Sequence, residues 1–417
     1  MSCDGNNATP PSPAIAPRLG PDPGAHELDP RRIADSIIHT FDGQSVDPRL
    51  PALVPGFDAP FVQAGLAGYS DAAMRLIARR HGCPLCVTEA LLDRTLLAGG
   101  RGFAKADLGD IDQNIPGGPD DHPLVGQIMG SDPAEMAAAA VKMIEQGARR
   151  EKAYRALVGA GAGPIAVESH AERTFAAIDI NLACPVKKIA RKARGGHWLA
   201  EPDGAIAMLE AVRDALPASI PVTVKMRRSF DDTPAMRDNF LRIFDAAYDL
   251  GVAWVTVHAR TVEQKYIGPS RWDLLREIVQ RRHPGRCRER LVFGSGDVWN
   301  VADIFRMLAY TGVSAVSVAR GCIGNPWIFR QARQILAGAA PAAPTLAEQR
   351  AVLEEHYALA LAVNRRMRDP DIQTAKMMRK FGVRFSEHHP SADTVRRAFI
   401  ACKSIDDWRA VLEAQYA

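Results

Sequence analysis

Residues 291–321, LVFGSGDVWNVADIFRMLAYTGVSAVSVARG, show the repeating unit that decides the fold. An apolar run, LVFGSGDV (291–298), precedes a helical pattern, and a second apolar run, SAVSVARG (314–321), follows it. Runs rich in Val, Ile and Leu, with few charges before their C-terminal ends, are typical of parallel strands that are buried on both faces. Because parallel neighbours need a crossover connection, this stretch predicts a strand–helix–strand unit.

The same unit recurs towards the N-terminus and brings the number of strand-like runs to eight. An alternation of eight such runs with helical stretches is the count of a (β/α)8 TIM barrel. An open doubly wound sheet is the competing fold, but it would normally carry G-x-G-x-x-G after its first strand, and this motif is absent there. The six further runs are DAPFVQA (58–64), CVTEALL (86–92), HPLVGQIMG (122–130), AAIDINLAC (176–184), IPVTVKMR (220–227) and WVTVHAR (254–260).

Three segments lie outside this repeat. Residues 1–50 are rich in Pro, Ala and Gly near their start and are predicted to form a disordered leader. The barrel domain then spans residues 51–335, with an insertion at about 151–175 that lengthens one connection. After residue 335 the strand pattern stops, and residues 336–417 predict helices only. The predicted class is therefore α/β, a TIM barrel followed by a small all-α C-terminal domain.

Composition places the chain among soluble globular enzymes. It has 417 residues, 47% of them hydrophobic and 24% charged, and a formal net charge of +4. The sequence contains neither an apolar stretch of about 18 residues nor a secretory signal pattern at its start, so we expect no membrane span. The seven cysteines are odd in number and irregularly spaced, which favours a reducing compartment, and we expect a cytoplasmic protein. Cys83 and Cys86 form a lone C-P-L-C, and we predict no metal site.

Polar residues gather where the predicted strands end. Active sites of TIM barrels lie at the carboxyl ends of their strands, so these residues are candidates for one site. A single Lys in such a place is usually a solvated charge, but six strands that deliver polar groups to one rim favour a functional site. The candidates are Gln127, Asn181, Cys184, Lys225, Arg227, His258, Arg260, Ser295, Gly296, Asp297, Arg320 and Gly321.

The last two strands predict a phosphate site. GSGD (294–297) and ARG (319–321) put glycines where the backbone must approach a ligand closely, unless they are ordinary turns at the rim. Loops after strands seven and eight are the common phosphate site of this fold, which implies a phosphate-bearing cofactor. If that cofactor is a flavin, Lys225 would place positive charge near its N1–C2=O edge and Gln127 would hydrogen-bond an edge of the ring.

Cys184 lies in N-L-A-C-P directly after the fourth predicted strand, on a loop over the barrel mouth. The loop continues with Lys187, Lys188, Arg191, Lys192 and Arg194 and has no acidic residue among them. A charge run is usually a solvated face, but beside a candidate catalytic thiol it favours a polyanionic substrate. Residues 362–417 are a second basic segment, with 11 Lys and Arg against 7 Asp and Glu.

Taken in order, these motifs resemble the tRNA-dihydrouridine synthase family of flavin-dependent enzymes. The resemblance runs from about residue 58 to residue 417, without the insertion. The sequence departs from the family pattern at Gly65, where the family has Pro, and at Ala183, His197, Trp198 and Ser295. The matching segments are AGLAGYSD (64–71), VGQIMGSDP (125–133), IDINLACPVKK (178–188), PVTVKMR (221–227), VHART (257–261), QKY (264–266), ARGCIGNPWIF (319–329) and MMRKF (377–381).

The resemblance implies that the protein binds FMN, uses NADPH as reductant and reduces a uridine of tRNA to 5,6-dihydrouridine, with no obligate protein partner. It implies hydride transfer from flavin N5 to C6 of a flipped-out uracil, while Cys184 protonates C5 as general acid. The implied FMN contacts are Gly65, Leu66, Ala67, Gln127, Lys225, His258, Ser295, Gly296, Asp297, Ala319 and Arg320. The expected RNA contacts are Asn181, Lys187, Lys188, Arg191, Lys192, Arg194, Arg260, Tyr266, Arg379 and Lys380.

Two other functions stay open at this point. The first is a flavin-dependent reductase or dehydrogenase of a free pyrimidine, which needs neither the basic run nor the helical tail. The second is an RNA-binding protein that has lost catalysis, against which the presence of Cys184, Lys225 and His258 argues.

Overall fold

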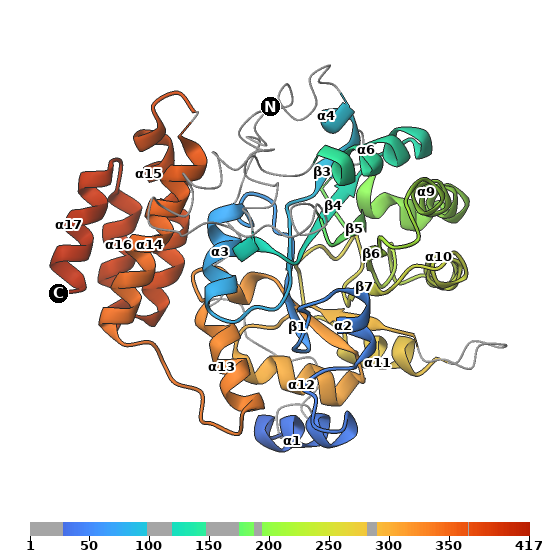
Figure 1. Cartoon of the computed structure of the whole chain (residues 1–417), viewed down its shortest axis with the longest axis horizontal. Helices are drawn as coiled ribbons and strands as arrows, with labels where there is room; N and C mark the ends of the chain where they lie inside the picture. The colour runs from blue at the N-terminus through green and yellow to red at the C-terminus, as the bar shows by residue number, and fades with distance from the viewer. Residues whose placement is uncertain (1–27, 98–118, 147–174, 187–193, 282–289, 366) are drawn as a thin grey trace.

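Eight parallel strands close into a barrel, as predicted (Figure 1). The computed structural model of the chain describes residues 28–97, 119–146, 175–186, 194–281, 290–365 and 367–417. Neighbouring strands pair in parallel around the ring, and the pairings β1–β9 and β2–β4 complete it. The strands are β1 (Phe61–Gln63), β2 (Cys86–Val87), β4 (Leu124–Met129), β5 (Ala177–Leu182), β6 (Val222–Arg227), β7 (Val255–His258), β8 (Val292–Ser295) and β9 (Ala315–Val318).

The second predicted strand is interrupted. Residues 86–92 form β2 and a further short strand, β3 (Leu91–Leu92), and both pair with β4. The break between them has a local cause, because the hydroxyl oxygen of Thr88 accepts a hydrogen bond from the backbone N–H of Gln127 at 2.9 Å. A side-chain acceptor thereby replaces the regular backbone ladder at this point.

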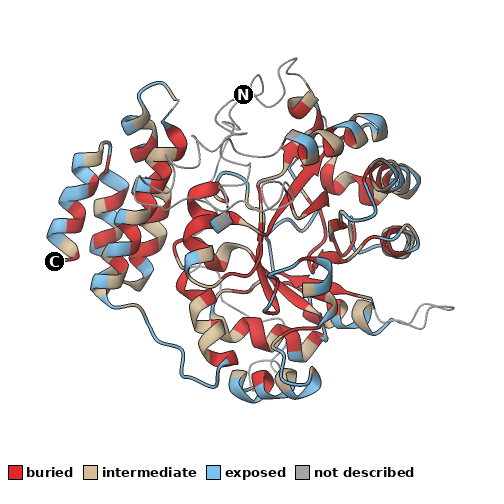
Figure 2. Cartoon of the chain, in the orientation of Figure 1, coloured by how far each residue is buried: buried red, intermediate tan, exposed pale blue. Residues whose placement is uncertain are grey.

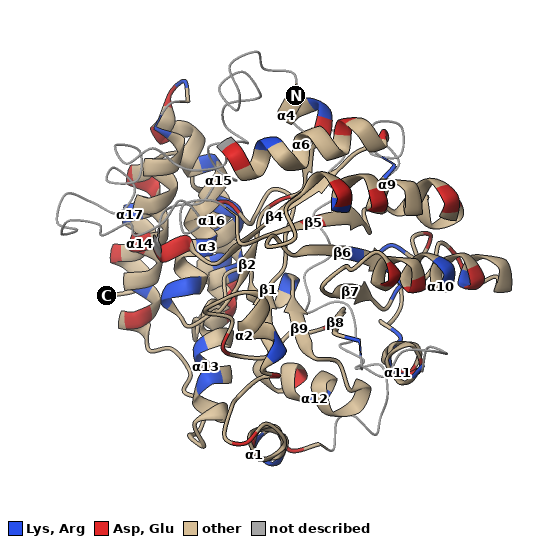
Figure 3. Ribbon diagram, turned by 45° about the vertical axis from the view of Figure 1, so that its right-hand side comes forward, with Lys and Arg blue, Asp and Glu red and all other residues tan. Residues whose placement is uncertain are grey.

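Helices surround the barrel and bury its outer face. Figure 2 shows buried residues throughout the central strands and along the inner sides of the helices. The outer sides carry both signs of charge, as α10 shows in Figure 3, with ion pairs such as Arg237–Glu277 at 3.0 Å. The helices beside the strands are α3 (Ala72–Arg80), α4 (Asp93–Leu97), α6 (Pro133–Gln146), α9 (Pro202–Ala215), α10 (Pro234–Asp249), α11 (Trp272–Gln280), α12 (Val301–Thr311) and α13 (Trp327–Leu336).

The C-terminal part is all helical, as predicted, and packs against one side of the barrel (Figure 1). The ring of Tyr69, from the loop before α3, meets the ring of Phe381 edge-on with centroids 5.6 Å apart. None of the helices among the described residues is long and apolar enough to span a membrane. The C-terminal helices are α14 (Leu346–Asn364), α15 (Pro370–Phe385), α16 (Ala392–Ala401) and α17 (Ile405–Gln415).

The expectation of disorder as far as residue 50 is wrong for residues 28–50. They contain helices α1 (Pro30–Thr40) and α2 (Arg49–Leu53). Asp29 caps α1 by accepting a hydrogen bond from the N–H of Arg31 at 3.0 Å, and Ile33 is buried in the core that the barrel helices share. The Pro- and Gly-rich composition before residue 28 masked this short amphipathic pattern. Residues 1–27, and residues 151–174 of the insertion predicted at about 151–175, lie outside the described residues.

Candidate active site

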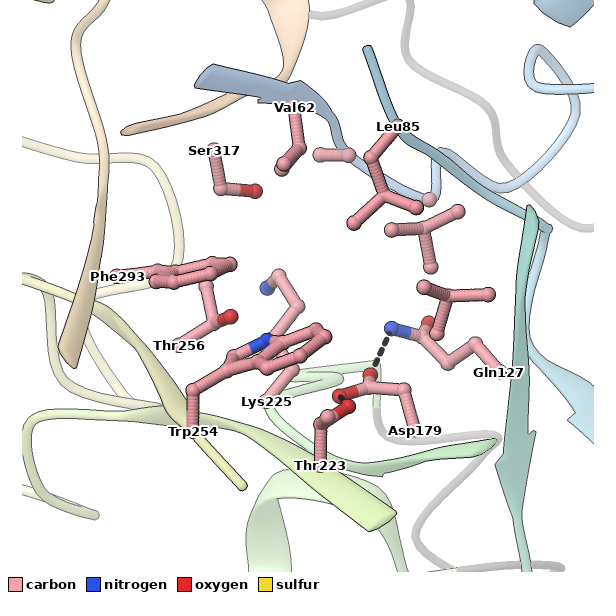
Figure 4. Close-up of a pocket in the computed structure, with 14 residues that line it drawn as sticks. Val62, Leu85, Gln127, Asp179, Thr223, Lys225, Trp254, Thr256, Phe293 and Ser317 are labelled. Carbon is pink, nitrogen blue, oxygen red and sulfur yellow. Dashed lines mark hydrogen bonds between the residues drawn. The ribbon is translucent and has the colours of Figure 1, made fainter. Parts of the chain in front are cut away.

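A small cavity lies inside the barrel, with an apolar floor and a polar side towards the carboxyl ends of the strands. Trp254 and Phe293 form part of the floor, with their rings stacked at 4.9 Å and 15°. Figure 4 shows that Gln127, Asp179 and Lys225 point into the cavity. They come from three consecutive strands of the ring, β4, β5 and β6, and therefore meet although they are far apart in the chain.

A carboxylate inside the barrel organises these polar groups. Asp179 accepts hydrogen bonds from the Thr223 hydroxyl at 2.6 Å and from Gln127 Nε2 at 2.7 Å. Burial raises the pKa of Asp179 to about 6, and the two hydrogen bonds and the charge of Lys225 act in the opposite direction. Asp179 was not among the predicted site residues, although the period of a strand could have identified it. Residues two apart share a face, so a site that contains Asn181 implies Asp179 beside it.

Lys225 and His258 are buried titratable groups on the next two strands of the ring, and Lys225 lies near the carboxylate of Asp179. Burial, together with the charge of Arg227, lowers the pKa of Lys225 to about 8, although Asp179 and Cys184 act in the opposite direction. Burial also lowers the pKa of His258 well below its ordinary value, as do the charges of Arg227 and Lys225. The backbone N–H of Arg260 donates to His258 Nδ1 at 3.2 Å, so this neutral ring carries its proton on Nε2.

The predicted phosphate turn after β8 is tightly packed. Gly296 has φ of +120°, and a Cβ there would lie 2.1 Å from Ser270 Oγ, so only glycine fits without a shift. Asp297 accepts hydrogen bonds from Arg260 Nη2 at 2.7 Å and from the N–H of Ser270 at 2.8 Å. After β9, a Cβ on Gly321 would meet the carbonyl oxygen of Val298 at 2.2 Å. The two turns therefore bring backbone groups close together at one edge of the mouth.

The residues at this edge suit the phosphate of a flavin nucleotide. Ser270 Oγ and Arg260 Nη1 are buried donors that lack a hydrogen-bond partner within the described part of the chain. The guanidinium of Arg320 lies over the rings of Trp299 and Tyr266, 4.5 and 5.1 Å from their centroids. Buried donors without partners are rare in native proteins, and an anion would satisfy them.

Cys184 is half-buried on the loop that follows β5 and is not in a disulfide. Its neighbours Lys187, Lys188, Arg191 and Lys192 lie outside the described residues. Arg194 is turned towards the body of the protein, since its guanidinium lies 4.6 Å from the ring centroid of Trp198 and pairs with Glu201.

The remaining expected RNA contacts divide into internal and exposed residues. Arg260, with 4% of its side chain exposed, binds Asp297 and the carbonyl of Gly268. Asn181 is also buried, and Lys380 donates to the carbonyl oxygen of Gly68. Each of these three residues therefore has a partner within the protein, which the sequence could not show, and its contact with RNA stays a prediction. Tyr266, 55% exposed, and Arg379, also exposed, do lie at the surface.

Lys380 joins the helical domain to the loop expected to contact FMN. Its ammonium group lies 4.7 Å from the ring centroid of Tyr69, and burial lowers its pKa while Asp71 and Glu89 raise it. The N–H of Gly68 donates to Glu89 at 2.7 Å, so both polar groups of Gly68 are bound. The position of residues 65–68 thus depends on a side chain about three hundred residues away.

We expect Lys380→Met to lower the free energy of unfolding by about 1.5–3 kcal/mol, the range for a hydrogen bond to a charged group. Denaturant unfolding measures this loss. Arg379→Met is the matched control: because Arg379 is exposed, its loss should change stability by less than about 0.5 kcal/mol. Unchanged stability in Lys380→Met together with weakened RNA binding would return Lys380 to the role of an RNA contact.

The fold and the site together define a TIM-barrel enzyme whose mouth collects a thiol, a lysine and two glycine turns. A family model described as "Dihydrouridine synthase (Dus)" matches residues 165–416. The chain is 30% identical to the "Probable tRNA-dihydrouridine synthase" of Treponema pallidum over 84% of this chain and 91% of that protein. It is 31% identical to "tRNA-dihydrouridine synthase B" of Shewanella oneidensis over 71% of this chain and 78% of that protein.

The chain therefore belongs to the dihydrouridine synthase family and is an oxidoreductase. This assignment confirms the family resemblance and favours it over the free-pyrimidine enzyme and the binding protein without catalysis. Among solved structures, histamine dehydrogenase from Rhizobium sp. 4-9 aligns with a TM-score of 0.43 at 12% identity, over 72% of this chain and 49% of that one.

Proposed function

We propose that this protein reduces a uridine of tRNA to 5,6-dihydrouridine, with FMN at the barrel mouth and NADPH as reductant. The observation that carries the proposal is that Cys184 follows β5 at the barrel mouth, next to β6, whose Lys225 lines the cavity. Relatives that align over most of their length are named tRNA-dihydrouridine synthases, which supports tRNA as the substrate. The cytoplasm, where tRNA and free thiols occur together, is the proposed location.

Different residues at the mouth would bind the phosphate and the ring system of FMN. The turns at Gly296 and Gly321 would hold its phosphate, with Ser270 and Arg260 as donors. Lys225 and Gln127 would face its ring system, as their place in the cavity suggests. The remaining predicted FMN contacts keep this assignment, namely Gly65, Leu66, Ala67, His258, Ser295, Asp297, Ala319 and Arg320.

When bound and reduced, the flavin would supply the hydride for C6 of the uracil. Cys184 would hold the proton for C5, on a loop that lies beside the mouth. Lys225 would hold positive charge beside the part of the ring system that gains negative charge, and this would favour reduction of the flavin. At pH 7 it carries that charge because its pKa is about 8. The apolar floor formed by Trp254 and Phe293 excludes water on the side of the cavity away from the mouth.

The tRNA would approach the rim that carries Tyr266. The guanidinium of Arg227 lies 5.6 Å from the centroid of this exposed ring, and Ile267 beside it is 77% exposed. An exposed aromatic ring beside cationic groups is a common stacking platform for unpaired bases. Lys187, Lys188, Arg191, Lys192 and Arg379 would contact the phosphate backbone, whereas Arg194 would do so only by leaving Trp198 and Glu201.

One experiment tests the proposal. The purified protein is examined for bound flavin, reconstituted with FMN, and incubated with tRNA that lacks dihydrouridine and with NADPH or NADH. We expect a flavoprotein that forms dihydrouridine, measured by mass spectrometry of digested tRNA, and faster turnover with NADPH. A protein that stays colourless after incubation with FMN would contradict the proposal, as would a flavoprotein that reduces free uridine but not tRNA.

A further inference from the structure

A continuous chain of hydrogen bonds runs from the interior of the barrel to the backbone of Cys184. It starts at Asp179, which accepts from Gln127 Nε2 at 2.7 Å. Gln127 Oε1 accepts from Asn181 Nδ2, also at 2.7 Å. Asn181 Oδ1 then accepts from the backbone N–H groups of Ala183 and Cys184, at 2.9 and 3.1 Å. The chain thus connects β4, β5 and the loop that carries the thiol.

The chemistry of the two ends dictates the direction of this chain. At one end a carboxylate can only accept hydrogen bonds, and at the other end two backbone N–H groups can only donate them. An amide has one donor end and one acceptor end, so Gln127 and Asn181 each have a single orientation that satisfies both neighbours. Because all three side chains are buried, a reversed amide would leave donors facing donors without water to separate them.

We propose that Asp179 is a positioning residue that acts through Gln127 and Asn181 to hold Cys184 at the barrel mouth. This inference rests on the proposed role of Cys184 as the general acid. Asp179 would not touch the uracil, because its two carboxylate oxygens are occupied by Thr223 and Gln127 inside the barrel. Asp179 would affect the rate by fixing the position of the thiol relative to C5. A misplacement of about 1 Å lowers such a rate by about 10²-fold.

Three variants separate positioning from simple stability. Asp179→Ala lets water enter, and water both donates and accepts, so the direction of the chain is no longer set. Asp179→Asn is the conservative rescue, since its Oδ1 can accept from Gln127 while its Nδ2 donates to the Thr223 hydroxyl. Thr223→Val is the matched control, because it removes a hydrogen bond to the same carboxylate and leaves the chain to Cys184 intact.

The first measurement needs no cofactor or substrate. Hydrogen exchange at the amides of Ala183 and Cys184, followed by mass spectrometry of a peptide over residues 181–186, should be about tenfold faster in Asp179→Ala, the ratio for one hydrogen bond. Asp179→Asn and Thr223→Val should exchange like the wild type. Unchanged exchange in Asp179→Ala would overturn the inference, and so would an equal acceleration in Thr223→Val, since this would indicate general loosening.

The second measurement separates the two half-reactions of the FMN-loaded enzyme. We expect tRNA-dependent oxidation of the reduced enzyme to slow by about 10²-fold more than reduction by NADPH does in Asp179→Ala, while the Kd for tRNA stays within about twofold. Equal slowing of both half-reactions would overturn the positioning role. If the wild type itself does not reduce tRNA, the proposed function fails, and the exchange experiment still decides whether Asp179 controls the loop.

Discussion

Replacing Cys184 by alanine should lower the rate of tRNA uridine reduction by about 10²- to 10⁴-fold, the usual contribution of a positioned general acid. Cys184 meets the geometric needs of this role. It is half-buried and not in a disulfide, and its backbone N–H is bound to Asn181 at the end of β5. The measurement is dihydrouridine formed per flavin-loaded enzyme in a single turnover, so that differences in flavin content do not contribute.

The control for this prediction is a cysteine far from the mouth. Cys402 is buried in the helical domain and bonds to the carbonyl of Ala398, so Cys402→Ala should keep the rate within about twofold. Reduction of the flavin by NADPH should be unaffected in both variants, because neither thiol has a part in that step. A full single-turnover rate in Cys184→Ala would remove the acid role of the thiol and leave the family assignment intact.

Substituting Gly65 by proline, the residue that the family usually has, should destabilise this chain and weaken flavin binding. A Cβ on Gly65 would lie 2.2 Å from the carbonyl oxygen of Thr88. Thr88 cannot move away easily, since its N–H is bound to Val125 and its hydroxyl to Gln127. We expect a loss of about 1–3 kcal/mol in the free energy of unfolding, as for overpacked sites, together with a higher Kd for FMN.

The control isolates backbone strain from crowding. Gly251 has φ of +82° and open space around its missing side chain, so Gly251→Ala should cost about 1–2 kcal/mol without any effect on FMN binding. Denaturant unfolding and fluorescence titration with FMN measure the two quantities. Wild-type FMN affinity in Gly65→Pro would show that the 65–68 loop does not contribute to the flavin site.

The barrel and much of its rim could be predicted because both depend on local patterns and on chain order. Each strand is recognisable from its own apolar residues, and parallel strands of one barrel place their carboxyl ends at one rim. Gln127, Lys225 and His258 were found on this basis. The strand period could have placed Asp179 beside Asn181, but the sequence gives no sign of the hydroxyl and the amide that bind its carboxylate.

The partner of a charged residue was harder to predict than the position of the charge in the sequence. Arg260 and Lys380 were expected to contact RNA, but each has an internal partner that belongs to another element. Residues 28–50 depend on distant partners in the same way, because α1 packs against α12 and α13, which follow more than 250 residues later in the chain.

The sequence by itself determined the closed barrel, the all-helical end of the chain, the family, and the thiol and glycine turns at the strand ends. These features follow from apolar periodicity, from glycine and from the order of short motifs, all of which are local. Only the tertiary structure decided the direction of the hydrogen bonds that run from Asp179 to Cys184, and the hydrogen bond from Lys380 to Gly68. The physical reason is that each of these hydrogen bonds joins groups that only folding brings together. A buried donor forms its hydrogen bond with an acceptor that is adjacent in the folded protein, wherever that acceptor stands in the sequence.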